Sequence, residues 1–451
     1  MSKGAEEIAK AAKSAFEASQ LVSSQERSDV LLAVKAELSR QKELILEANK
    51  KDMEAAQAQV AAGSLSASLV KRLDLSSGDK WDSMLQGVVD VSKLPDPLGR
   101  VTYSIALDDG LELYRVTCPI GVLLIIFEAR PEVVINIASL AIKSGNAAIL
   151  KGGKESLHST TALANCVRTA LSQSRLPDDY IQVVQTREEI SQLLEQDKYI
   201  DLVIPRGSNA LVSHIQHSTR IPVMGHADGL CTVFLDESAD PTKATRVVVD
   251  SKINYPAACN SAEILVIHSS VLDTVWPKVA EALVSAKVEL RCDERTLAAI
   301  PSSVSHSGLV KSASPSDFAT EFLSLIMAVK AVDTFEEAVA FINAHSSHHT
   351  DSIVTESTPN ASSFCRSVDS AGTFVNASTR FADGLRYGFG TEVGISTGRT
   401  HARGPVGLEG LTIYKYMLKS GGEGGHIVGE FGTGSGKKSY KHEAIVGRLP
   451  F

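Results

Sequence analysis

Short, continuously apolar runs that alternate with helix-like stretches constrain this chain more than any other feature. Four such runs follow one another in the first half: GVLLIIF at 121–127, NAAILK at 146–151, IQVV at 181–184 and DLVIPRG at 201–207. An unbroken apolar run is typical of a strand buried on both faces. Strands that alternate with helices imply right-handed crossovers, so this region predicts a mostly parallel sheet.

A second series of strand-like runs begins near residue 231 and predicts a second α/β domain. Its members are CTVFLD at 231–236, AEILVIH at 262–268, LIMAVKAV at 325–332 and GTFVN at 372–376. The segment 421–436 is rich in glycine, which favours a loose tail or loop.

The first ninety or so residues have helical periodicity instead. Ser23 and Glu26 have the spacing of a capping box. Pro95-Asp96-Pro97 marks a break, and alternating apolar residues then flank Asp108-Asp109-Gly110. An Asp-Gly turn between alternating runs predicts a β-hairpin at 101–116.

Composition excludes several classes of protein. The 451 residues carry a net charge of −8, which argues against a nucleic-acid partner. No apolar run is long enough to span a membrane, and the N-terminus does not resemble a signal or transit peptide, so we expect a cytoplasmic protein. The six cysteines include no CxxC pair and no zinc-like spacing, which predicts free thiols and no metal site.

Cys259 lies in the segment with the most distinctive chemistry, Asn254-Tyr255-Pro256-Ala257-Ala258-Cys259-Asn260-Ser261. Small neighbours leave room for an electrophile, and a turn leading into a helix there could aim backbone N–H groups at a thiolate. The alternative is that Cys259 is one ordinary buried cysteine among six.

This segment resembles the nucleophile motif NYPxACNxxE of gamma-glutamyl phosphate reductases, which Glu263 completes. Further stretches are similar to the same family and occur in one register: PIGVLLIIFEARPE at 119–132, SGNAAILKGGKES at 144–156, HHTDSIVTES at 348–357, VDSAGTFVNASTRFADG at 368–384 and EVGISTGRTHARGPVGLEGLTIYKY at 392–416. The resemblance spans about residues 5 to 420. It implies an aldehyde-dehydrogenase-like α/β fold with two Rossmann-like parallel-sheet domains and a β-hairpin oligomerisation element.

The same resemblance implies a division of the chain into domains. A cofactor-binding domain with N-terminal helices would comprise 1–98 and 117–230, and a catalytic domain would comprise 231–405. The oligomerisation element would be the hairpin 99–116 with part of 406–420, and residues 421–451 would form a glycine-rich C-terminal tail.

No GxGxxG motif follows a strand, so the resemblance supplies the candidate residues for NADPH. It implies that Lys151 lies near the adenosine ribose, that Gly207-Ser208 opens a helix beneath the pyrophosphate, and that Glu321 holds the nicotinamide ribose. Lys154 stands where NAD-preferring relatives tend to have glutamate, and would attract a 2′-phosphate. The alternative for either lysine is an ordinary solvated charge.

Arginines are the candidate ligands for an anionic substrate. The resemblance favours Arg380 and Arg403, with Asn376 and Ser378 adding neutral hydrogen bonds, whereas the alternative is that all four are ordinary loop residues.

The implied reaction is the reduction of L-glutamyl 5-phosphate to L-glutamate 5-semialdehyde through a thioester on Cys259, the second step of proline biosynthesis from glutamate. One alternative is an aldehyde dehydrogenase that hydrolyses its thioester, but the segment Gly225-His226-Ala227-Asp228-Gly229 lacks the glutamate that serves as water base there. A second alternative is a non-catalytic NADP-binding member of the fold. A homo-oligomer, dimer or tetramer, and a glutamate 5-kinase partner are expected.

Overall fold

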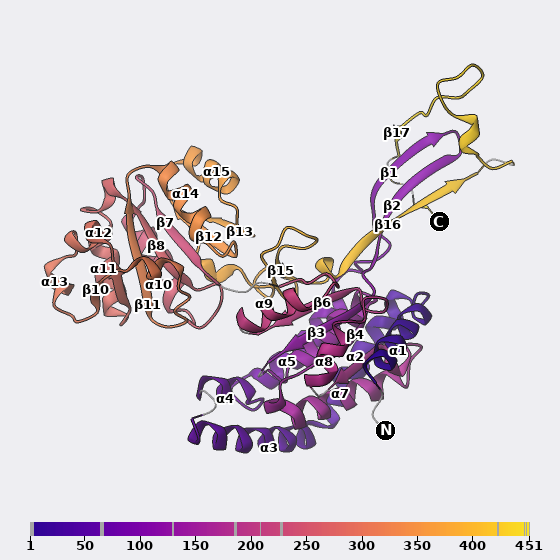
Figure 1. Cartoon of the computed structure of the whole chain (residues 1–451), viewed down its shortest axis with the longest axis horizontal. Helices are drawn as coiled ribbons and strands as arrows, with labels where there is room; N and C mark the ends of the chain where they lie inside the picture. The colour runs from indigo at the N-terminus through magenta and orange to yellow at the C-terminus, as the bar shows by residue number, and fades with distance from the viewer. Residues whose placement is uncertain are drawn as a thin grey trace. The chain divides into compact units, whose positions relative to one another are not determined.

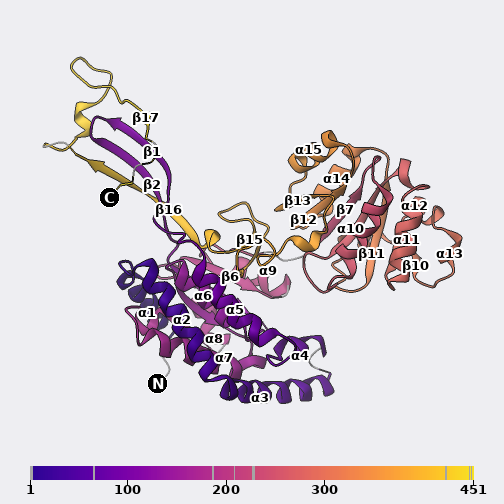
Figure 2. The same cartoon turned by 180° about the vertical axis from the view of Figure 1, so that it is seen from behind.

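A computed structural model of the chain consists of two compact units. Unit 1 comprises residues 1–204, 218–223 and 407–451, and unit 2 comprises residues 205–217 and 224–406. The structure describes residues 4–63, 67–128, 130–184, 187–207, 209–225, 229–421, 424–445, 447 and 449–450. Figures 1 and 2 show the elements of both units from opposite sides.

Unit 1 begins with the helices that the periodicity predicts. They are α1 (Ala5–Ala18), α2 (Ser24–Arg40), α3 (Lys42–Ala61), α4 (Ala67–Leu73) and α5 (Lys80–Lys93). The predicted capping box opens α2, because Glu26 N donates to Ser23 Oγ at 3.2 Å and Ser23 N donates to Glu26 Oε2 at 2.7 Å. The backbone and side-chain hydrogen bonds of Ser23 lower the pKa of Glu26 to about 2.

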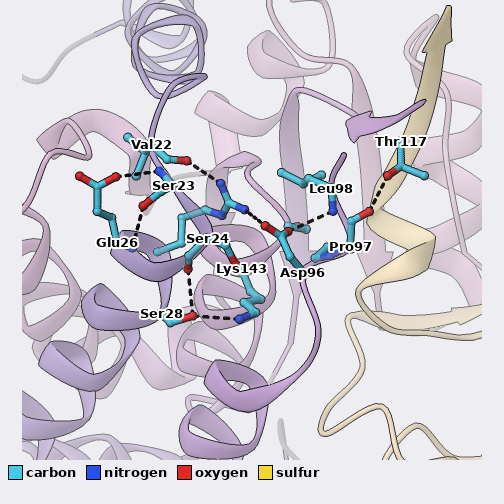
Figure 3. A network of polar contacts seen from close by, with 12 residues as sticks. Val22, Ser23, Ser24, Glu26, Ser28, Asp96, Pro97, Leu98, Thr117 and Lys143 are labelled. Atoms are coloured by element: carbon cyan, nitrogen blue, oxygen red, sulfur yellow. Dashed lines mark hydrogen bonds and ion pairs between the residues drawn. The ribbon is translucent and has the colours of Figure 1, made fainter. Parts of the chain in front are cut away.

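A polar network joins the start of α2 to the proline-rich break at 95–97 (Figure 3). The Arg27 guanidinium is buried and bonds both the Val22 carbonyl and Asp96 Oδ2 at 2.7 Å. Thr117 Oγ1 donates to the Pro97 carbonyl at 2.7 Å, and this contact continues the network into the hairpin. The buried Arg27 side chain is tolerated here because its guanidinium donates hydrogen bonds to a carbonyl and to a carboxylate.

A four-stranded sheet with the order β5-β4-β3-β6 forms the centre of unit 1. Its strands and helices are β3 (Val122–Phe127), α6 (Val133–Lys143), β4 (Ala147–Lys151), α7 (Leu157–Leu171), β5 (Ile181–Val184), α8 (Arg187–Leu193) and β6 (Leu202–Arg206). Pairing of β3 with β4 and of β4 with β5 is parallel, and β3 is wholly buried, as its apolar run predicts. The order is that of one half of a doubly wound fold.

The predicted hairpin is present and gains two further strands. β1 (Val101–Asp108) and β2 (Leu111–Pro119) pair antiparallel around a turn in which Gly110 has φ 73. β16 (Thr412–Ser420) pairs with β2 along its whole length, and β17 (Glu443–Ala444) pairs with β1. Beyond residue 421 the described residues form the short 3-10 helix η7 (Val428–Glu430) and the two-residue strand β17, which pairs with Ile105 and Ala106 of β1.

Unit 2 contains a parallel sheet of seven strands, with the order β10-β9-β11-β8-β7-β12-β13. Its strands are β7 (Cys231–Leu235), β8 (Ala262–His268), β9 (Glu289–Cys292), β10 (Val310–Ser312), β11 (Ile326–Val332), β12 (Thr350–Val354) and β13 (Gly372–Val375), and β14 (Gly394–Ser396) and β15 (Gly404–Val406) form a separate antiparallel pair. Two parallel-sheet units confirm the predicted fold class.

Helices cover both faces of the seven-stranded sheet. The helices of unit 2 are α9 (Asn209–Ser218), α10 (Pro241–Ile253), α11 (Trp276–Ser285), α12 (Glu294–Ala298), α13 (Ser302–Ser305), α14 (Phe335–His345) and α15 (Thr358–Ser367). Trp276 and its neighbours pack with alternate residues of β7 and β8 on one face, and Phe364 packs with the remaining ones on the other. None of the described helices combines the length and the apolar character of a membrane span.

Candidate active site

Cys259 lies in a loop that follows α10 and enters β8. The expectation that its turn leads into a helix is therefore wrong, since a strand follows at Ala262. Two tight turns shape the loop, because Ala258 N donates to the Tyr255 carbonyl at 3.1 Å and Ser261 N donates to the Ala258 carbonyl at 2.9 Å. Tyr255 has φ 63, which an L-residue adopts only where the surrounding structure holds it.

Gly229, just before β7, lies directly against the backbone of Cys259. A Cβ at this glycine would come within 2.2 Å of the Cys259 carbonyl oxygen and 2.6 Å of its Cα. No side chain fits there without moving the loop, so the glycine is required by close approach.

His349 makes a direct contact with the Cys259 thiol. Its Nε2 lies 3.3 Å from Sγ, and its Nδ1 lies 3.0 Å from Thr350 Oγ1. The imidazole is 1% exposed, whereas the cysteine is partly exposed. A histidine at this distance can accept the thiol proton or stabilise the thiolate.

Residues around the start of β12 fix the place of His349. The preceding His348 has φ 61, and its Nδ1 lies 2.5 Å from the Asp369 carbonyl oxygen. Asp351 is wholly buried and accepts hydrogen bonds from Thr232 N and Ser346 Oγ. The loop that carries the histidine is thereby tied to the sheet.

The environments of the other cysteines differ from that of Cys259. Burial raises the pKa of Cys166 to about 11 and that of Cys292 to about 12, and it raises the pKa of Cys231 well above the ordinary value. Thiols of this kind are protonated at neutral pH and unreactive. Cys365 is exposed, and its Sγ lies 3.9 Å from the Thr373 carbonyl oxygen.

Arg380 is a predicted substrate ligand in a turn that contacts the Cys259 loop, since the neighbouring Thr379 donates from Oγ1 to the Asn260 carbonyl at 2.7 Å. Arg380 lies in the short 3-10 helix η5 (Thr379–Phe381) and is 7% exposed, and its Nε has no hydrogen-bond partner among the described residues. Burial lowers its pKa, and the neighbouring Cys259, when ionised, is among the groups that oppose the shift. A buried guanidinium with an unused donor favours an anionic ligand.

Ser378 and Asn376 support this turn through their own hydrogen bonds. Ser378 Oγ accepts from Arg380 N at 3.3 Å and from Ser251 Oγ at 3.2 Å. Asn376 bonds the backbone of Thr355 in both directions, each at 2.9 Å. The Asn376 side-chain amide thus links the end of β13 to the end of β12.

Arg403 is bound elsewhere in unit 2. Its guanidinium bonds Asp369 Oδ1 at 2.9 Å and the Asp369 carbonyl at 3.1 Å, and Arg399 shares the same carboxylate. These two arginines lower the pKa of Asp369. The contact is an ion pair within the protein, so Arg403 would have to exchange partners to hold a substrate.

Two of the candidate cofactor residues that the structure describes belong to unit 2. Gly207 lies in the exposed turn after β6, and α9 begins at Asn209. The N-terminus of a helix can bind an anion. Ser208 lies outside the described residues. Glu321 lies in the segment before β11, where its charge acts on both Glu263 and Lys252.

The two candidate lysines belong to unit 1. Lys151 is the last residue of β4 and is buried, whereas Lys154 begins the short 3-10 helix η1 (Lys154–Ser156) and is exposed. Open α/β sheets bind dinucleotides outside the carboxyl ends of their strands, where Lys151 lies. The Gly152-Gly153 turn between them lets the chain pass close to Phe127 and Thr160.

Sequence reasoning missed His349 and Lys252. His349 is ninety residues from Cys259 in the chain, and its motif carried no role of its own. The only signal was the position of a histidine directly before a polar strand, TDSIV.

Within the described chain, no group of three or more histidine, cysteine or acidic residues is arranged to hold a metal ion.

Comparison with known proteins agrees with this fold. The Aldehyde dehydrogenase family profile matches residues 2–302. A probable gamma-glutamyl phosphate reductase of Schizosaccharomyces pombe is 54% identical over 98% of this chain and 97% of its own length. The gamma-glutamyl phosphate reductase of Saccharomyces cerevisiae is 46% identical over 98% of both chains.

A solved structure extends the similarity to three dimensions. The crystal structure of gamma-glutamyl phosphate reductase from Thermotoga maritima superposes with a TM-score of 0.86 at 37% identity, over 92% of this chain and 98% of that one. The chain therefore belongs to the aldehyde dehydrogenase family. Within that family it is similar over nearly its whole length to gamma-glutamyl phosphate reductases, which confirms the resemblance seen in the sequence.

Proposed function

We propose that this chain is an NADPH-dependent reductase that converts L-glutamyl 5-phosphate to L-glutamate 5-semialdehyde and phosphate, the second step of proline biosynthesis from glutamate. The observation that carries the reaction type is the Cys259 thiol beside His349, at 3.3 Å. The identity of the substrate is supported by the names of the full-length relatives.

Thiol activation begins the proposed reaction. His349 Nε2 accepts the proton of Cys259, and the resulting thiolate attacks the acyl carbon of the substrate. The carbon–oxygen bond to phosphate then breaks, and a thioester remains on the protein. Covalent catalysis divides one difficult step into two easier ones.

Substrate orientation is assigned to Arg380. Its buried guanidinium lies near the thiol and can bind a carboxylate or phosphate through two parallel hydrogen bonds. Ser378 and Asn376 would hold the turn, and Arg403 would contribute only after leaving Asp369.

Cofactor binding is assigned to Lys151, Lys154, Gly207, Ser208 and Glu321. The fit rests on Lys151 at the carboxyl end of β4 and on the helix that begins after Gly207. When bound, the nicotinamide cofactor supplies the hydride that reduces the thioester. The thiohemiacetal on Cys259 then collapses, so that the carbon–sulfur bond breaks and the aldehyde leaves.

Assembly and location complete the proposal. The three long antiparallel strands β16, β2 and β1 present exposed aromatic residues, among them Tyr414 and Tyr416, as expected of an element that joins subunits. We propose a homo-oligomer, dimer or tetramer, a cytoplasmic location, and an association with a glutamate 5-kinase that would supply the labile acyl phosphate.

A spectrophotometric assay tests the proposed activity. Purified enzyme with NADP⁺, phosphate and glutamate semialdehyde should form NADPH, observed as absorbance at the reduced nicotinamide band. Oxidation of simple small aldehydes without phosphate would support the aldehyde dehydrogenase alternative instead. Tight NADPH binding without turnover on any substrate would support the non-catalytic alternative.

Lys154→Glu should shift cofactor preference from NADPH toward NADH. A carboxylate at this exposed position repels the 2′-phosphate that the lysine attracts, so the ratio of kcat/KM for NADPH to that for NADH should fall about tenfold or more. The measurement is kcat/KM for both cofactors in both proteins. Lys10→Glu on α1 makes the same change of charge at another exposed lysine of unit 1 and should leave the ratio unchanged. An unaltered ratio in Lys154→Glu would remove this lysine from the cofactor site.

A further inference from the structure

A fully buried ion pair closes the base of the Cys259 loop. Lys252 is the penultimate residue of α10 and Glu263 is the second residue of β8, so the two residues flank the loop. Lys252 Nζ lies 2.6 Å from Glu263 Oε2, and both side chains are 0% exposed. Ser261 Oγ adds a second tie to the same helix end, with the carbonyl of Ser251 at 3.1 Å.

Stability alone does not account for this pair. Two charges removed from water lose their hydration, and apolar residues of similar volume often serve a buried site as well or better. Burial raises the pKa of Glu263 to about 7, with Lys252 opposing the rise, and burial lowers the pKa of Lys252. The Glu263 carboxylate also has a second partner, the backbone N–H of Leu323.

The second oxygen of Glu263 holds the segment that carries Glu321. Oε1 accepts a hydrogen bond from Leu323 N at 3.2 Å, two residues after Glu321. Leu323 has φ 53, a conformation that leucine rarely adopts and that needs an external contact to persist.

Arg291 fixes the same segment from its other side. Its guanidinium lies over the Phe322 ring, 5.0 Å from the centroid, and bonds Asp317 Oδ1 at 2.5 Å. Asp317 in turn closes a capping box with Ser314. Glu321 therefore lies between two anchored points, and the contact of Glu263 with Leu323 links this segment to the strand that follows the Cys259 loop.

We propose that Lys252 and Glu263 are positioning residues that set Glu321 relative to Cys259, with Glu263 acting through the main chain of Leu323. The proposal rests on the proposed function, in which Glu321 binds the nicotinamide ribose. Lys252 orients the Glu263 carboxylate. The carboxylate then fixes the position of Glu321, the ribose ligand, relative to the Cys259 loop. An ionised acceptor gives a stronger hydrogen bond to a backbone N–H than a neutral one does.

Two double variants isolate the hydrogen bond to Leu323. Lys252→Met with Glu263→Leu removes both charges and the acceptor, whereas Lys252→Met with Glu263→Gln removes the charges and keeps a carbonyl oxygen. We expect the Leu variant to bind NADPH about tenfold more weakly than the Gln variant in a fluorescence titration. In a Glu321→Ala background this difference should disappear, because Glu263 then has no ligand to position.

Single substitutions keep the test interpretable if a double variant does not fold. Glu263→Gln alone exchanges the ionised acceptor for a neutral one and leaves the buried Lys252 without its partner, so the NADPH Kd should rise about threefold to tenfold. Lys243→Met breaks the exposed pair that α10 makes with Glu356 and should leave both NADPH affinity and turnover unchanged.

Three results would overturn the coupling. These are equal NADPH affinities in the two double variants, a difference that persists with alanine at 321, and an unchanged NADPH Kd in Glu263→Gln. Each of them leaves the proposed reaction intact. If Glu321→Ala alone left NADPH affinity and kcat unchanged, the cofactor role of Glu321 would be wrong, and the coupling would fail with it.

Discussion

Replacing Cys259 with alanine should lower kcat by at least about 10³-fold while NADPH binding stays close to that of wild type. The thiol supplies the bond to the acyl carbon, and no other described cysteine has a histidine at 3.3 Å. Turnover is measured from NADPH formation and binding from NADPH fluorescence. Because the substitution removes one atom from a partly exposed position, the fold should survive.

Two further variants show whether the loss is specific to Cys259. Cys365→Ala removes an exposed thiol of the same unit and should retain full activity. His349→Ala should lower kcat by about 10²- to 10⁴-fold, the range of a lost general base, and should slow alkylation of Cys259 by iodoacetamide. Retention of more than a few per cent of activity in Cys259→Ala would contradict the thioester mechanism.

Local signals in the sequence predicted much of the fold. The Ser23–Glu26 capping box and the Asp109-Gly110 turn depend on contacts within a few residues, so the residue types suffice to specify them. Apolar runs likewise predicted β3 and β8, since a strand buried on both faces needs an unbroken run. The family resemblance added the arrangement of two sheets and a hairpin, which periodicity by itself does not provide.

Other strands lacked such a signal. β9 and β10 are short, and β12 has the sequence TDSIV, in which the polar residues are all buried. Asp351 is tolerated there because hydrogen bonds from Thr232 and Ser346 reach it, and Thr232 lies 119 residues away in the chain. Burial of this kind follows from tertiary contacts and cannot be inferred from residue type.

Some residues of the candidate site could likewise be predicted from the sequence, and others could not. Cys259 and Arg380 were predicted because family motifs mark them, whereas His349 and the pair of Lys252 with Glu263 depend on contacts across the fold. Arg403 shows the opposite case. It has the residue type of an anion ligand, but Asp369 already engages its guanidinium, and sequence alone could not identify that competitor.

The thioester on Cys259 can be attacked by water or by phosphate, and this choice should have a large effect on turnover. Water is a weak nucleophile without a positioned base, whereas phosphate is already anionic at neutral pH and needs mainly to be positioned. Gly225 and Gly229 carry no carboxylate in the segment where hydrolytic relatives have their glutamate, and residues 226–228 lie outside the described residues. Arg380 offers a buried cation near the thiol that could position the anion.

Run in the direction of semialdehyde and NADP⁺, the enzyme should therefore require inorganic phosphate. Without phosphate, NADPH formation should stop after at most one equivalent per active site and then continue at least about 100-fold more slowly. Arsenate should restore the rate, because it has the same shape and charge as phosphate, whereas sulfate at equal ionic strength lacks the nucleophilicity and should not. The burst and the slow phase are both measured by stopped-flow absorbance. Sustained turnover without phosphate, at a rate comparable to that with it, would mean that His349, His226 or Asp228 serves as a base for water, and the hydrolytic aldehyde dehydrogenase would then be the better description of the activity.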